Sequence, residues 1–122
     1  MIGSLMMRVS VVILFFGMLA GIVMGIAQDF ALAPAHAHLN LIGGVLLFLF
    51  GLYYRLIPAA GTTSLAKVQG WLHIIGAILM PAGVAAVIHE GNAFVPLAVV
   101  GSLVVIAAVV LFGAVVFQTS KL

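Results

Sequence analysis

Two histidines and an asparagine stand close together in the segment APAHAHLNLIGG, residues 33–44, of a chain that carries very few charges. Imidazole rings bind metal ions and carry protons, so His36 and His38 are the first candidates for chemistry. Two residues along an α-helix amount to a turn of about 200°, so the two rings leave a helix on nearly opposite sides. They cannot chelate one ion from a single helix, which needs i, i+4 spacing, but they can serve two sites on its two flanks.

Spacing alone leaves two interpretations of these residues open. The histidines are ligands of a bound group, or their rings reach toward the headgroups at a membrane interface. Asn40 follows His38 after a further turn of about 200°, which places it on the same face as His36. There its amide either contacts a ligand or forms a hydrogen bond to a neighbouring helix.

The composition places these residues in a membrane. Of the 122 residues, 66% are hydrophobic, four are basic and two are acidic. A soluble domain cannot have this composition, because its surface would lack polar groups. The four basic residues are too few for a nucleic-acid-binding surface. The absence of cysteine excludes disulfides, thiolate metal sites and cysteine chemistry.

Four apolar segments are long enough to cross a bilayer, which takes about 20 residues. A backbone that spans a bilayer must satisfy its own hydrogen bonds, so each segment is expected to be a helix. The sequence therefore predicts an all-α, polytopic membrane protein with one domain, residues 1–122, embedded in the lipid bilayer. The predicted transmembrane helices lie at about residues 9–27, 35–57, 65–88 and 94–117.

The charged residues predict how these helices are oriented. The acidic residues, Asp29 and Glu90, fall in the two predicted loops on one side of the membrane. The basic residues all fall on the other side, with the first of them before the first helix: Arg8, Arg55, Lys67 and Lys121. The positive-inside rule places the basic side in the cytoplasm. Both termini are therefore expected to be cytoplasmic, in an inner membrane of the bacterial type.

Three glycines on the first predicted helix follow the small-xxx-small spacing that lets helices approach closely. Gly17, Gly21 and Gly25 share one face of that helix. This face is expected to form a seam with another helix or a surface against a flat ligand.

Two segments resemble a known family. Residues 35–58, AHAHLNLIGGVLLFLFGLYYRLIP, resemble the tenth transmembrane helix of subunit I of haem–copper oxidases, in which an H-x-H pair opens the helix. Residues 67–84, KVQGWLHIIGAILMPAGV, resemble the helix that follows it, and the likeness extends to the catalytic subunit of nitric oxide reductase. The first and fourth predicted helices match only as apolar spans. The histidines that hold copper in the family are missing here, as are its paired arginines.

The resemblance implies that His36 and His38 each bind a haem b, on opposite flanks of one helix. Asn40 shares the face of His36 and is therefore expected to contact the same cofactor. The family subunit is a ring of three four-helix arcs, and this chain is similar to one arc. Three copies in a C3 ring would give a homotrimer in which His36 of one subunit and His38 of the next bind the same haem. Iron with two histidine ligands has no open position, so the implied function is electron transfer rather than enzymatic oxygen reduction. Two alternatives remain: a non-catalytic accessory or assembly subunit of a respiratory oxidase, or a carrier of haem or copper.

His73 lies in the third predicted helix and is not expected to bind the same iron. At about 1.5 Å per residue, it lies roughly 12 Å above one membrane face, whereas His36 lies roughly 30 Å above it. A hydrogen bond within the bundle is the expected role, and a proton relay is the alternative.

Overall fold

A computed structural model describes residues 1–120 and confirms an all-α chain with four segments long and apolar enough to span a membrane. The second of these segments combines α2, η1 and α3, and the fourth combines η2 and α6. The elements are, in order, α1 (Ile2–Ala27), α2 (Ala33–His38), the π-helix η1 (Leu39–Leu46), α3 (Leu47–Leu56), α4 (Pro58–Gly61), α5 (Ser64–Glu90), the 3₁₀-helix η2 (Asn92–Phe94) and α6 (Val95–Thr119).

The observed bounds correct the predicted ones at several points. The first helix begins at Ile2 rather than near residue 9, so Arg8 lies inside α1 and not before it. The second span is not a single α-helix, because a π-helical segment, η1, occupies its middle. Glu90 ends α5 instead of lying in a loop. Lys121, one of the four basic residues that predict the orientation, lies outside the described residues.

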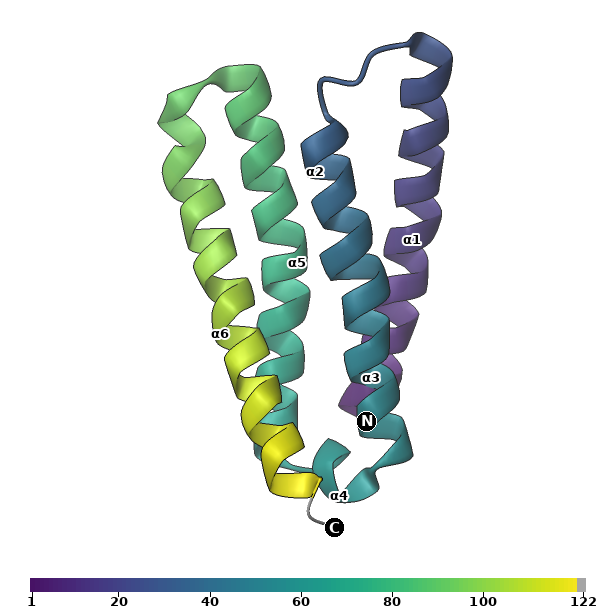
Figure 1. The fold of residues 1–122 in the computed structure, drawn as a ribbon, viewed down its shortest axis with the longest axis vertical. Helices are drawn as coiled ribbons and strands as arrows, with labels where there is room; N and C mark the ends of the chain where they lie inside the picture. The colour runs from purple at the N-terminus through teal and green to yellow at the C-terminus, as the bar shows by residue number, and fades with distance from the viewer. Residues whose placement is uncertain (121–122) are drawn as a thin grey trace.

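The four spans run alternately up and down, so the N-terminus and the end of α6 lie at the same end of the bundle (Figure 1). We call this the termini end, and the opposite end, which holds the connections between α1 and α2 and between α5 and α6, the loop end. Segments that follow one another along the chain pack side by side: α1 against η1 and α3, α2 and η1 against α5, and α5 against α6. This is the helix order of an arc.

Most of the buried core lies at the termini end. The rings of Phe50 and Phe112 stack there with centroids 3.8 Å apart. Tyr54 donates a hydrogen bond to Gln69 Oε1 at 2.9 Å, and Gln69 Nε2 donates to the carbonyl of Ala108 at 3.1 Å. Tyr54 and Gln69 are fully buried, so these bonds satisfy polar groups that would otherwise be unpaired and tie α3, α5 and α6 together.

The α5–α6 pair depends on two glycines where the helix backbones touch. A Cβ at Gly101 would lie 2.6 Å from Met80 Cα, and a Cβ at Gly83 would lie 2.6 Å from Ala98 Cα. Backbone atoms cannot rotate away, so Gly101→Ala is expected to lower the free energy of unfolding by about 1–3 kcal/mol. Gly113→Ala on the same helix is the matched control, since a Cβ there meets nothing within 4 Å. Equal denaturation midpoints for the two variants in detergent would refute this role of Gly101.

Candidate functional site

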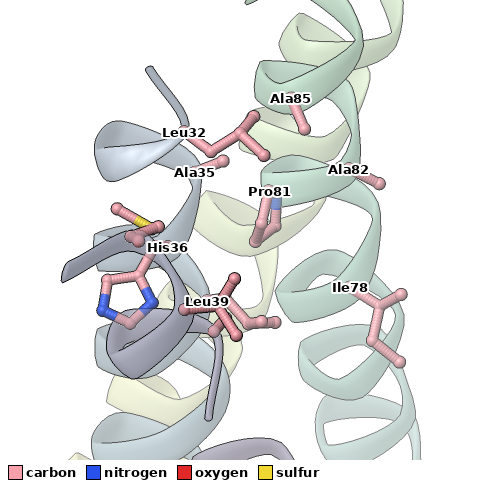
Figure 2. Close-up of a pocket in the computed structure, with 11 residues that line it drawn as sticks. Leu32, Ala35, His36, Leu39, Ile78, Pro81, Ala82 and Ala85 are labelled. Carbon is pink, nitrogen blue, oxygen red and sulfur yellow. The ribbon is translucent and has the colours of Figure 1, made fainter. Parts of the chain in front are cut away.

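An apolar cavity of about 430 Å³ lies in the loop-end half of the bundle, between α1, α2 and α5. Its volume falls in the range of roughly 300–1,000 Å³ that is usual for small-molecule and cofactor sites. Figure 2 shows the His36 ring at its edge beside Leu39, with Ile78 and Pro81 of α5 on the far side. The lining residues are Ala20, Val23, Met24, Leu32, Ala35, His36, Leu39, Ile78, Pro81, Ala82 and Ala85.

The sequence forms this cavity by placing small residues on helix faces that meet. Each wall uses i, i+3 and i+4 positions, which lie on one face of a helix. On α5 this face carries Ala82 and Ala85 beside Pro81. Alanine side chains are too short to fill the space between the helices. Within residues 1–120, His36 is the only lining residue with a polar side chain, so the cavity is apolar except for one imidazole at its edge.

The His36 ring has one engaged nitrogen and one free nitrogen. Its Nε2 lies 3.3 Å from Asn40 Nδ2, which confirms that these two residues share a helix face. Its Nδ1 is buried and has no hydrogen-bond partner among the described residues. A buried ring nitrogen without a partner is costly in an apolar surrounding unless something binds it. The geometry therefore leaves Nδ1 as the ring atom available to a ligand.

His38 has the opposite arrangement. Its Nδ1 lies 2.6 Å from the carbonyl oxygen of Pro34, one turn earlier. A carbonyl only accepts, so Nδ1 carries the proton, and Nε2 of the neutral ring keeps a free lone pair. His38 does not line the cavity; the outer surface of this span carries Leu41 and Val45, which are exposed. Each histidine thus offers one ring nitrogen to a ligand.

Gly17 and Gly21, on one face of α1, pack against the polar residues of this site. A Cβ at Gly21 would lie 3.2 Å from His36 Cε1, and a Cβ at Gly17 would lie 2.8 Å from Asn40 Cγ. Both glycines therefore pack against the polar side chains of the second span, which is the close helix contact expected as one alternative for this face. Gly25 is different, because a Cβ there would meet nothing within 4 Å.

His73, on α5, contacts the neighbouring π-helical segment η1. It is fully buried, and its Nε2–H donates to the carbonyl of Ile42 at 3.0 Å. The same carbonyl accepts the backbone N–H of Leu47, five residues later, as in a π-helix. The hydrogen bond expected for His73 is therefore present, and it joins α5 to η1.

Replacing His73 by leucine is expected to weaken the bundle and, if His36 and His38 bind haem as the sequence resemblance implies, to leave that haem in place. The change removes one interhelical hydrogen bond, worth about 1–2 kcal/mol at most in a membrane, and leaves the Ile42 carbonyl with its backbone partner alone. The measurement is the unfolding midpoint together with the absorption spectrum of the same sample. A bleached protein that keeps its fold and assembly would show that His73 is a ligand.

The fold and the four apolar spans define the class: this is an all-α, multi-pass membrane protein. Comparison with models of known families, with curated proteins and with solved structures finds no match for the chain. These comparisons therefore do not link the chain to the haem–copper oxidases.

Proposed function

We propose that this protein is a small b-type cytochrome of the membrane, a homotrimer in which each protohaem lies between subunits, bound by His36 of one and His38 of the next. One observation carries the proposal: the two rings lie on different faces of one helix, and each has one nitrogen engaged and the other free. This is the arrangement of two ligands that serve two different ions.

The residues present fit a haem. A flat, apolar macrocycle needs apolar walls, and the cavity beside His36 is lined by aliphatic side chains and alanines. Histidines that bind a metal usually donate their other ring N–H to a carbonyl or carboxylate, which fixes the tautomer. His38 makes this contact with the carbonyl of Pro34. His36 Nδ1 is buried without a hydrogen-bond partner among the described residues, as is His73 Nδ1, but only His36 borders the cavity, where an iron would satisfy its ring nitrogen.

The position of the ligands favours a haem shared between subunits. His36 is at the edge of the cavity inside one chain, whereas His38 is not among the residues around that cavity. One chain therefore cannot direct both rings at the same iron. An ionisable ring facing lipid is also unfavourable, so a neighbouring subunit is the better partner for His38. A C2 dimer would satisfy these requirements as well; the arc-like order of helices and the family resemblance favour three copies.

The two ends of the bundle support the proposed orientation. Arg55 and Lys67 are exposed and flank α4 at the termini end, while Asp29 lies at the loop end. With the positive-inside rule, this places both termini in the cytoplasm and the haem-binding half near the outer face of an inner, cytoplasmic-type membrane. Bound haem would supply one-electron transfer, since two histidine ligands leave its iron no open position. The chain itself holds the rings and surrounds the His36 side of the haem with apolar side chains.

The absorption spectrum of the purified protein tests this function. The proposal predicts a red protein whose reduced form has the split α and β bands of low-spin haem, and a pyridine haemochrome of the b type. An accessory or assembly subunit that binds no cofactor would be colourless. A carrier would release its haem or copper to an acceptor, whereas a cytochrome with two histidine ligands keeps its haem through repeated reduction and oxidation.

A further inference from the structure

The Asn40 side chain occupies a confined position between α1 and η1. Gly17 faces it, and a Cβ at Gly17 would overlap the Asn40 amide, so any side chain there would have to displace that amide. The amide is held beside the His36 ring, with Nδ2 3.3 Å from Nε2. Gly21 borders the same ring, where a Cβ would lie 3.3 Å from Nε2. In this packing the ring nitrogen that faces the amide is Nε2.

The chemistry of the amide decides what the ring can then do. An asparagine side chain has an NH₂ donor and a carbonyl acceptor, and a half-turn of the amide exchanges them. With the NH₂ toward the ring, Nε2 accepts and the proton of the neutral imidazole is on Nδ1. With the oxygen toward the ring, Nε2–H donates and Nδ1 keeps a free lone pair. Asn40 engages Nε2 in both cases, but only in the second orientation does Nδ1 keep the lone pair that binds a metal.

Two atoms without partners favour the second orientation when a ligand is bound. Asn40 Oδ1 and His36 Nδ1 are both buried and have no hydrogen-bond partner among the described residues. When the amide is turned, Asn40 Oδ1 accepts a hydrogen bond from Nε2–H of His36. The lone pair of His36 Nδ1 is then free to bind an electron-pair acceptor such as a metal ion. The Pro34 carbonyl supports the His38 ring in the same way from the other nitrogen. An oxygen acceptor behind the ring is the usual support of a metal-binding histidine.

We propose that Asn40 is a positioning residue for His36: its amide oxygen accepts the Nε2–H, which fixes the tautomer in which the Nδ1 lone pair is presented to the metal. The identity of the metal rests on the proposed function. The pairing of Asn40 with His36 rests on contacts within this chain alone, so the two can be tested separately.

Nitrogen NMR of the haem-free protein, with ¹⁵N-labelled histidines in lipid nanodiscs, tests the pairing. Protonated and unprotonated ring nitrogens have well-separated shifts, and His36→Ala identifies the signals of His36. Asn40→Leu is expected to change the tautomer signals of His36 and to leave those of His38 in place. Asn92→Leu, at an exposed asparagine of η2, is the matched control and should change neither. Identical His36 signals in the wild type and Asn40→Leu would overturn the proposal.

Titration with ferric protohaem tests the consequence for the metal. Asn40→Leu is expected to weaken haem binding by about 10–100-fold, which is typical for the loss of such a supporting group. Asn40→Asp should restore binding and lower the midpoint potential, because a carboxylate accepts the Nε2–H more strongly than an amide. An Asn40→Leu protein with wild-type affinity and potential would overturn the positioning role. A wild type that binds no haem, together with the NMR difference, would reject the proposed function and keep the Asn40–His36 pairing.

Discussion

Replacing either His36 or His38 by alanine is expected to remove the low-spin haem from the purified protein. Each haem in the proposed trimer needs one ring of each kind, so a single change in the chain removes one ligand from every site. The haem-to-chain ratio, from a pyridine haemochrome assay and amino-acid analysis, should fall from about one to near zero in both variants. His89→Ala is the matched control, since His89 is an exposed histidine at the end of α5. This variant should keep its haem.

Mixing the two variants gives a sharper result than either alone. Each haem site lies at the boundary between two neighbouring subunits. A site is intact only where the subunit that supplies His36 keeps that residue and the next subunit, which supplies His38, keeps that one. When both variants are co-expressed in equal amounts, each boundary has one chance in four of being intact, so about a quarter of the wild-type haem should return. Mixed preparations with no more haem than the separate variants would contradict binding between subunits. Haem retained at full occupancy in both single variants would reject both residues as ligands.

Gly17→Leu is expected to have the largest effect of any change outside the ligands. A leucine there must displace the Asn40 amide and push α1 away from η1, because the Cβ alone overlaps that amide. Overpacking of this kind costs about 1–3 kcal/mol or more, and the disturbance falls directly beside His36. The variant should therefore lose both thermal stability and haem, as measured by unfolding in detergent and by the absorption spectrum.

Gly25→Leu provides the control for this prediction on the same helix face. It lies two turns further along α1, where a Cβ meets nothing within 4 Å, so its stability and spectrum should match those of the wild type. Equal stability and equal haem content of Gly17→Leu and Gly25→Leu would show that Gly17 is not specifically required for packing against Asn40 and His36. Both variants add the same apolar side chain, so hydrophobicity does not distinguish them.

The general fold was predictable from the sequence because membrane spans leave a strong signal. Four long apolar segments separated by short loops allow few structures other than four helices. The structure contains four such helical spans. The shared face of His36 and Asn40 followed from helical geometry, and the contact between them confirms it. The hydrogen-bonding role of His73 also followed from its depth in the bundle, although its partner did not.

Other features depend on contacts that periodicity does not report. The π-helix η1 lies in a sequence that is equally compatible with a plain α-helix, and it is joined to α5 through the contact between His73 and the Ile42 carbonyl. The α5 wall of the cavity, with Pro81, Ala82 and Ala85, was not predicted. The sequence pattern that accompanies this wall is a set of small residues at helical spacing. The same pattern would be expected where two helices simply pack closely. Gly25 shares the spacing of Gly17 and Gly21 but not their contacts, because α1 and α2 separate toward the loop end.

Native mass spectrometry of the intact detergent-solubilised complex tests the central claim most directly, because one mass reports both the number of chains and the number of haems. A cytochrome with haem between subunits of a C3 ring predicts three chains and three haems in the main species, with haem lost when the ring dissociates. A monomer that carries a full complement of low-spin haem would contradict the account, because one chain would then place two ligands on the same iron.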